Sequence, residues 1–289
     1  MRQKLGQHFL KNKEAIKTIL RALEVKTSDI IIEVGPGHGE LTQPLVEICR
    51  KNKCQKVIAV EKDIKLAERL KKKTEANVVS ADILKILPQL SQKFKDSKFK
   101  IVGNIPYYLT GKLLRIIAEL KDKPSLIVFT LQKEVGLRIC GQPPKMIRSI
   151  SSGSSRASRG MNLLAASVQY WAKPKIIGYI SKKDFQPAPE VDSVIIKLLP
   201  INPDKTRIGA EKYYKLIRIL FKQPRKTILN NLLLSLVKEK KYQKTAKIKI
   251  AEKLKSINIE PFQRPQDLDI NQLILFLKYC IINITPDRV

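Results

Sequence analysis

The stretch Asp29-Ile30-Ile31-Ile32-Glu33-Val34-Gly35-Pro36-Gly37-His38-Gly39 decides the fold expected of this chain. Its first half is a β-branched run typical of a buried strand, and its second half is a loop with three glycines. Leu41, Leu45 and Ile48 then follow at helical spacing. A strand, a glycine loop and a helix in succession bring the backbone close to a nucleotide-like ligand, which predicts an α/β fold.

Three further strands are expected over residues 56–60, 77–82 and 99–103, and a polar residue marks the end of each. The carboxyl ends of parallel strands meet at one rim of a sheet, so four residues should gather there: Gly35, Glu61, Asp82 and Asn104. A carboxylate at Glu61 can accept hydrogen bonds from ribose hydroxyls, and one at Asp82 can accept from an adenine amino group. Glu33, inside the first strand, suits a ligand with an ammonium group, such as a methionine moiety.

The spacing of the glycines separates this loop from that of the dehydrogenases. Gly35, Gly37 and Gly39 form GxGxG, whereas the dinucleotide fingerprint is GxGxxG. The pattern therefore favours a small nucleoside ligand over a dinucleotide.

Asn104-Ile105-Pro106-Tyr107-Tyr108 follows the fourth strand and carries the candidate chemistry. The Asn104 amide can donate and accept, Pro106 fixes the turn, and Tyr107 offers a flat face to a planar ligand. A lone Asn-x-Pro-Tyr is more often an ordinary loop with a buried tyrosine. Three other strand ends on the same rim favour a functional site.

The remainder of the chain predicts two domains. Helical spacing over residues 14–23 and 163–170 and strands over 125–131, 175–180 and 194–199 extend the first domain, residues 1–200. The proline-rich loop 183–189 should hold Phe185 in a fixed position. Four helical segments, at 213–221, 227–237, 244–254 and 272–282, predict a small all-α domain over residues 205–289. Residues 147–160, rich in serine and arginine, are expected to form a flexible insertion.

Charge is the strongest signal in the composition. Among 289 residues, 56 Lys and Arg against 26 Asp and Glu give a formal net charge of +30. Such an excess favours a polyanionic partner, RNA or DNA, although a lysine-rich proteome would also produce a basic surface. The sequence has no apolar run of membrane-spanning length and no signal peptide, so a cytosolic chain is expected. Its four cysteines show no metal-ligand spacing and are expected to be reduced thiols.

Together, these motifs resemble the small-subunit ribosomal RNA adenine N6,N6-dimethyltransferases, the rRNA adenine dimethylase family. The matching stretches run in order along nearly the whole chain: Gly6-Gln7-His8-Phe9-Leu10, Glu33-Val34-Gly35-Pro36-Gly37, Asn104-Ile105-Pro106-Tyr107, Phe185-Gln186-Pro187-Ala188-Pro189-Glu190-Val191-Asp192-Ser193, Phe221-Lys222-Gln223-Pro224-Arg225-Lys226 and Arg264-Pro265-Gln266-Asp267-Leu268. The resemblance implies a class I S-adenosylmethionine-dependent methyltransferase with a seven-stranded Rossmann-like sheet and a helical C-terminal domain. Residues 147–160 depart from the family pattern.

The resemblance also implies a role for each site residue. The positions that match cofactor-contacting residues are His8, Leu10, Gly35, Glu61, Asp82 and Asn104, and family members often carry Asn where His8 stands. The Asn104 side chain and the carbonyl of Ile105 or Pro106 would accept the two hydrogens of the target amine. Tyr107 and Phe185 would sandwich the extruded base.

The implied reaction is dimethylation of two adjacent adenosines near the 3′ end of small-subunit (16S) rRNA by a monomeric enzyme. Three alternatives stay open at this point. One is the macrolide-resistance methylase of large-subunit rRNA, which shares the Asn-x-Pro-Tyr motif, and another is a DNA adenine methyltransferase. The third, from a different class, is an RNA-binding assembly factor that has kept the fold without the activity.

Overall fold

A computed structural model of the chain describes residues 8–141, 160–201, 209–237 and 239–280. Gly6 and Gln7 lie outside these ranges, as does the serine- and arginine-rich tract 147–160 apart from Gly160. Contacts divide the chain into two compact units. One contains the residues up to Gly136 together with Ala172–Pro200, and the other contains Leu137–Trp171 and the residues from Ile201 onward.

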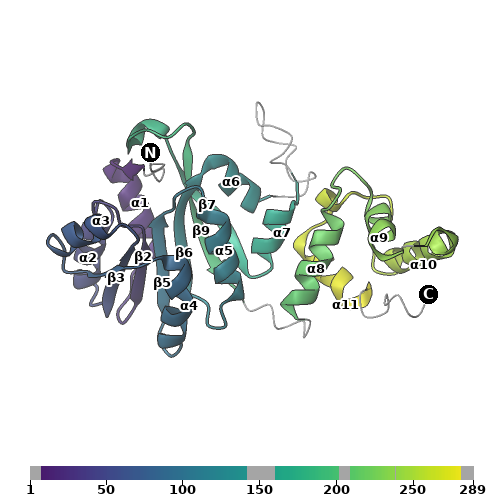
Figure 1. The fold of residues 1–289 in the computed structure, drawn as a ribbon, viewed down its shortest axis with the longest axis horizontal. Coiled ribbons are helices and arrows are strands. Elements are labelled where there is room, and N and C mark those ends of the chain that lie inside the picture. Colours follow the sequence, from purple (N-terminus) through teal and green to yellow (C-terminus); the bar gives the residue numbers. More distant parts are fainter. Residues whose placement is uncertain (1–7, 142–159, 202–208, 238, 281–289) are drawn as a thin grey trace. The chain divides into compact units, whose positions relative to one another are not determined.

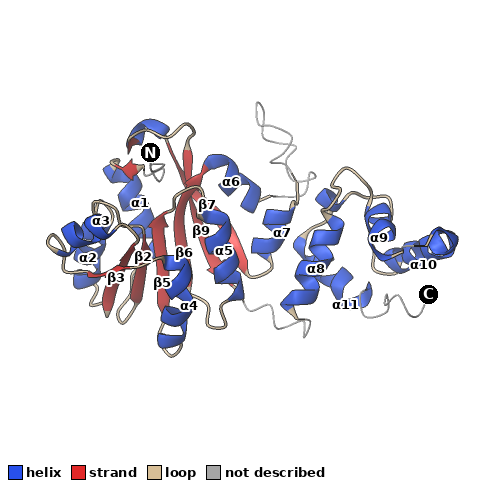
Figure 2. Cartoon of the chain, in the orientation of Figure 1, coloured by secondary structure: helices blue, strands red, loops and turns tan. Residues whose placement is uncertain are grey.

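The first unit is built on a seven-stranded sheet with the order β4-β3-β2-β5-β6-β9-β7 (Figures 1 and 2). The strands from β4 to β6 are parallel, while β9 pairs antiparallel with both β6 and β7. Their bounds are β2 Ile30–Val34, β3 Lys56–Glu61, β4 Asn77–Ser80, β5 Phe99–Asn104, β6 Leu126–Gln132, β7 Ala172–Ile180 and β9 Ser193–Pro200. The expected seven-stranded α/β fold is confirmed.

Helices cover both faces of this sheet, which explains why its central strands are almost continuously apolar. On one face, α1 (Lys13–Leu23) and α2 (Thr42–Lys51) share a core with Ile31, Val57 and Val102, and α3 (Ile64–Lys71) packs on β3 and β4. On the other face lie α4 (Ile83–Lys93) and α5 (Thr110–Glu119), seen in front of the strands in Figure 1. The helix expected over residues 14–23 is confirmed.

A separate two-stranded sheet, which the sequence did not predict, joins β1 (Phe9–Leu10) to β8 (Phe185–Gln186). The short helix η3 (Lys182–Asp184) precedes β8, and the Lys11 amide donates to the carbonyl of Asp184 at 2.8 Å. This pairing fixes residues from the two ends of the first unit side by side.

The central strands β2 and β5 approach each other closely because Gly103 lacks a side chain. A Cβ at this position would lie 2.6 Å from the carbonyl oxygen of Val34 and 3.2 Å from its Cβ. Gly103 therefore allows the residues after it to emerge beside the glycine loop that follows Val34.

A buried ion pair anchors the sheet to α1. The ammonium of Lys100, on β5, lies 2.7 Å from Asp29 Oδ2 and donates to the carbonyl of Leu23 at 3.1 Å and to that of Glu24. Because all three protons of the ammonium have acceptors, the charge of Lys100 is compensated inside the protein.

The second unit is helical in its described part. It contains α7 (Leu163–Gln169), α8 (Ala210–Leu220), α9 (Ile228–Leu236), α10 (Gln243–Lys255) and α11 (Ile270–Cys280), with the short helices η5 (Lys240–Tyr242) and η6 (Pro265–Asp267) between them. The buried Tyr213 donates to the carbonyl of Ala166 at 2.9 Å and stacks on Tyr170 with ring centroids 4.0 Å apart. These contacts place α7 with the C-terminal helices, although in the chain it lies between strands of the sheet, after α6 (Lys133–Ile139).

Two further expectations concern the whole chain. Cys49 and Cys54 are paired as a disulfide in the structure, so the expectation of reduced thiols is wrong for these two. They are brought together because α2 ends between them and the chain turns back at Lys53, which has a positive φ of 54°. None of the helices in the described part of the chain has the length and apolar character needed to cross a membrane.

Candidate active site

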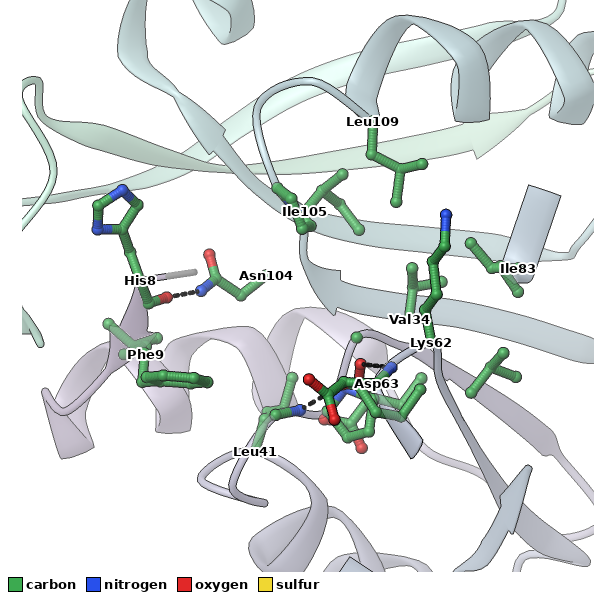
Figure 3. Close-up of a pocket in the computed structure, with 18 of the residues that line it drawn as sticks. His8, Phe9, Val34, Leu41, Lys62, Asp63, Ile83, Asn104, Ile105 and Leu109 are labelled. Atoms are coloured by element: carbon green, nitrogen blue, oxygen red, sulfur yellow. Dashed lines mark hydrogen bonds between the residues drawn. The ribbon is translucent and has the colours of Figure 1, made fainter. Parts of the chain in front are cut away.

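A cavity of about 220 Å³ opens at the carboxyl ends of β2, β3, β4 and β5 in the first unit. The segment His8–Leu10 forms another part of its wall (Figure 3). All ten residues singled out from the sequence line this cavity: His8, Leu10, Gly35, Glu61, Asp82, Asn104, Ile105, Pro106, Tyr107 and Phe185. The predicted gathering of strand ends at one rim is therefore confirmed.

The glycine loop is shaped by backbone angles that favour glycine. Gly35, Gly37 and Gly39 have φ values of 64°, 60° and 93°, a region in which a side chain would be strained. A Cβ on Gly37 would also lie 2.6 Å from the ring of Phe9. The absence of a side chain on Gly37 thus lets the loop pass beneath Phe9.

Glu61 is held by this loop in a fixed orientation. One carboxylate oxygen accepts from the Gly37 amide at 3.1 Å and the other from the Asp63 amide at 2.9 Å. Each oxygen keeps a further lone pair, because a carboxylate can accept about four hydrogen bonds. Glu61 can therefore accept from two neighbouring hydroxyls without losing the bonds that orient it.

Asp82 lies just beyond β4, which ends at Ser80 rather than at residue 82, and it forms the N-cap of α4. It accepts from the Leu84 amide at 3.0 Å and pairs with Lys62 Nζ at 2.9 Å. Partial burial acts to raise the pKa of Asp82, but the hydrogen bonds from Lys62 and Leu84 outweigh it and lower the pKa. The carboxyl is therefore ionised at neutral pH, and both of its oxygens can accept hydrogen bonds from an amino group.

Lys62 is a cavity residue that the sequence analysis missed. It stands beside Ile83 and Val34 in Figure 3 and keeps its ammonium at the exposed side of the cavity. Its only signal in the sequence was its place directly after Glu61, which does not distinguish it from the many other lysines.

Glu33 lies on β2 and is almost fully buried, yet its Oε2 atom has no hydrogen-bond partner among the residues that the structure describes. Burial raises the pKa of Glu33 to about 8; the negative charges of Glu61 and Glu40 add to the rise, and Thr42 opposes it. A buried carboxyl with an unused oxygen at a cavity wall is suited to a cationic ligand group, which would supply the missing partner.

Asn104 ends β5 with its amide in a defined orientation. Its Nδ2 atom donates to the backbone carbonyl of His8 at 2.7 Å, as the dashed line in Figure 3 shows. A carbonyl can only accept, so the amide nitrogen of Asn104 must face His8 and its Oδ1 atom is the acceptor left for another group.

Tyr107 and Phe185, the two aromatic residues expected to hold the base, differ in how deeply they are buried. Tyr107 is half-buried, and this burial raises the pKa of its phenol, opposed by a hydrogen bond with Ser193. Phe185 is 6% exposed and packs in the core with Leu10 and Ile16, so it shows only a small part of its ring to the cavity. The stacking of a base between the two rings stays a prediction.

Comparisons with known proteins agree with this geometry. A family model described as ribosomal RNA adenine dimethylase matches residues 1–267. The Ribosomal RNA small subunit methyltransferase A of Mycoplasma mycoides is 35% identical over 274 residues, covering 93% of each chain. The protein of the same name from Dehalococcoides mccartyi is 34% identical over 278 residues, covering 94% of this chain and 85% of its own.

Two solved structures share the fold. The dimethyladenosine transferase from Plasmodium falciparum matches with a TM-score of 0.73 at 24% identity, covering 94% of this chain and 97% of its own. The 23S rRNA methyltransferase ErmE matches with a TM-score of 0.66 at 20% identity, covering 94% and 99%. With a family model that spans residues 1–267 and relatives of about one-third identity over nearly its whole length, this chain belongs to the ribosomal RNA adenine dimethylase family.

Proposed function

We propose that this protein transfers methyl groups from S-adenosylmethionine to the N6 atoms of two adjacent adenosines near the 3′ end of small-subunit (16S) rRNA. Family membership and the relatives named as small-subunit methyltransferases support the reaction and the substrate class. The observation that carries the proposal is the orientation of Asn104. Among the described residues, no hydrogen bond occupies its Oδ1 acceptor, which lies beside a cavity whose other walls suit a nucleoside.

The residues of the cavity fit the cofactor. Glu61 has lone pairs for the two ribose hydroxyls, Asp82 is an ionised acceptor for the adenine amino group, and Glu33 has an unpartnered oxygen for the ammonium of the methionine moiety. Gly35 leaves open space, since nothing lies within 4 Å of the position that its Cβ would take. When bound, the cofactor supplies an electrophilic methyl group on sulfur.

Asn104 and the residues after it would orient the amine that attacks this methyl group. The exocyclic amine of adenine is a poor nucleophile, because its lone pair is delocalised into the ring. If Asn104 Oδ1 and the carbonyl of Ile105 or Pro106 accept the two amino hydrogens, the lone pair turns toward the methyl group. The contribution is one of positioning and electrostatics, and the proton can leave after the attack.

Tyr107 and Phe185 are proposed to hold the base while it reacts. Enzymes that modify a base extrude it from its stack, and an aromatic face stabilises the extruded base by about 1–3 kcal/mol. Tyr107 already has an accessible ring, whereas Phe185 must become more exposed to take part.

The net charge of +30 supports a ribosomal substrate. We place the catalytic site in residues 1–200 and assign residues 205–289 to contacts with rRNA or with the immature subunit. Ribosome biogenesis in the cytoplasm and a monomeric enzyme are the corresponding proposals for location and assembly.

The test is transfer of tritiated methyl groups to small subunits that lack the modification, followed by mapping of the labelled adenosines by reverse-transcription stops. We expect label on two adjacent adenosines of small-subunit rRNA. Label on large-subunit rRNA would instead indicate the macrolide-resistance type of methylase, and label on DNA an adenine methyltransferase of DNA. Binding to the subunit without any transfer would indicate a non-catalytic assembly factor.

A further inference from the structure

His8 contacts the site in two ways from a single position. Its backbone carbonyl accepts the hydrogen bond from Asn104 Nδ2 at 2.7 Å, and its side-chain Nδ1 atom donates to the carbonyl of Pro187 at 2.8 Å. Its ring also lies 5.9 Å from that of Tyr107, tilted by 30°. One residue thus joins the Asn104 motif to the loop after β8, which is 179 residues away in the chain.

The direction of the His8 imidazole shows which side of the cavity the ring faces. In Figure 3 the imidazole of His8 points away from Phe9, while the Phe9 ring lies over the glycine loop. The side chain of His8 therefore faces Tyr107 and Pro187, where the target base is proposed to enter. Its described hydrogen bonds are with Asn104 and Pro187.

Within the described part of the chain, the bond from Asn104 is the one contact of the His8 carbonyl, so the backbone there gains from a second anchor. The pairing of β1 with β8 begins only at Phe9, so His8 lies just outside the last strand pair. The bond from Nδ1 to Pro187 extends that pairing by one residue through a side chain. It thereby fixes the carbonyl against which the Asn104 amide is oriented.

We propose that His8 is a positioning residue for methyl transfer, in addition to any contact with the cofactor. By binding Pro187 it holds its own carbonyl against Asn104, so that Asn104 Oδ1 stays directed at the target amine. This inference rests on the proposed function and adds to it a residue that acts through Asn104. Asn, which is frequent at this position in the family, has an amide nitrogen that can replace Nδ1 as the donor to Pro187.

The test compares three variants at saturating cofactor: His8→Leu, which removes the donor, His8→Asn, which keeps one, and Lys11→Ala as a control. Lys11→Ala removes the ion pair with Glu40 on the same segment without contacting Asn104. We expect His8→Leu to lower kcat on unmethylated small subunits by about 10- to 100-fold, the size of effect that a small misplacement of a reacting group produces. His8→Asn should restore most of the rate, and Lys11→Ala should leave it within about twofold of the wild type.

Cofactor affinity separates this role from simple cofactor binding. The Kd for S-adenosylhomocysteine, measured by calorimetry, should change less than about threefold in His8→Leu. A threefold change in Kd corresponds to about 0.7 kcal/mol of binding free energy. An unchanged kcat combined with a much weaker Kd would overturn the proposal, because His8 would then act only as a cofactor ligand. Loss of rate in His8→Asn equal to that in His8→Leu would overturn it as well.

A spectroscopic readout keeps the inference testable even if the wild type proves inactive. With selective ¹⁵N-asparagine labelling, the side-chain amide signal of Asn104 is identified by its loss in Asn104→Ala. We expect this signal to be protected from solvent exchange in the wild type and in His8→Asn, and to be broadened by exchange in His8→Leu. Equal protection in all three proteins would contradict the inference, whereas absence of turnover in the wild type would contradict only the proposed function.

Discussion

Glu33 is the most perturbed carboxyl at the cavity, with a pKa raised to about 8 by burial. In the unfolded chain this carboxyl titrates near its ordinary value of 4.5. Between these two values the folded protein retains a proton that the unfolded chain has lost. The contribution of Glu33 to stability is therefore most favourable below pH 4.5 and declines as the pH rises toward 8.

Glu33→Gln removes this titration and should make the protein more stable at high pH. At pH 9 we expect the melting temperature of the variant to exceed that of the wild type by about 5 °C or more, since each pKa unit corresponds to about 1.4 kcal/mol. At pH 5 the difference should shrink to about 2 °C or less, because Glu33 is then neutral in the folded protein and only partly ionised in the unfolded chain. Glu47→Gln, the same substitution at an exposed glutamate, provides the matched control. A difference that stays constant from pH 5 to pH 9 would contradict the burial of an ionisable Glu33.

Tyr107 is the aromatic residue best placed to stack on the target base. Tyr107→Ala should raise the KM for the small subunit about tenfold, which corresponds to a stacking contribution of about 1.4 kcal/mol. Tyr107→Phe keeps the ring and should retain the wild-type KM to within about threefold. Steady-state kinetics at saturating cofactor measures both values. An unchanged dependence of the rate on substrate concentration in Tyr107→Ala would count against stacking at this position.

At the level of the elements, the site depends on how closely β2 and β5 approach at Gly103. Gly103→Ala would place a Cβ 2.6 Å from the Val34 carbonyl, so the two strands must separate. Overpacking of this kind typically costs about 1–3 kcal/mol of unfolding free energy. We also expect methyl transfer to fall, because Gly103 directly precedes Asn104.

A matched glycine provides the control for this substitution. Gly111 lies in α5, and nothing lies within 4 Å of the position that its Cβ would take. Gly111→Ala should stabilise the protein by about 0.5–1 kcal/mol, because alanine is the better helix former. Chemical denaturation of both variants tests the pair. Equal stability of Gly103→Ala and the wild type would mean that the strands tolerate a side chain at their closest point.

Sequence patterns predicted the elements that carry their own local signal. The β-branched run Ile30–Val34 and the helical spacing of residues 14–23 reflect which side chains are buried. The strand and the helix could therefore be predicted from the sequence. The rim residues could be predicted too, because parallel strands place their carboxyl ends together. The pairing of β1 with β8 could not be predicted, since each strand has only two residues and its partner lies far away in the chain.

Other features depended on packing that no local pattern encodes. The ion pair of Lys62 with Asp82 involves one lysine among many, and only the fold selects it. No local pattern assigns α7 to the second unit either. That assignment arises from contacts such as the hydrogen bond from Tyr213 to the carbonyl of Ala166. The core position of Phe185 is a further case, because its proline-rich loop indicated rigidity and not burial.

At the scale of the whole molecule, the charge of +30 should dominate the encounter with the ribosomal subunit. Arg225 and Lys226 are exposed in the second unit and lie in a family-like stretch. Reversal of both charges to Glu should weaken subunit binding about tenfold or more at low salt and make binding less dependent on salt. The same reversal at Lys71 and Lys72 in the first unit should have a smaller effect. Filter binding measures the affinity for the subunit. If the two charge reversals weaken binding equally, the protein is attracted by its overall charge and not by a specific contact in the second unit.

The central claim is that Asn104 orients the amine that accepts the methyl group, and the most direct measurement is single-turnover methyl transfer by Asn104→Ala. The assay uses unmethylated small subunits, with calorimetry of S-adenosylhomocysteine binding in parallel. We predict that the variant binds the cofactor product with a Kd within about tenfold of the wild type, since only one of several contacts is lost. Its rate of transfer should fall by about a thousandfold or more, to near background. Transfer at a rate close to that of the wild type would contradict the account and remove Asn104 from the chemistry.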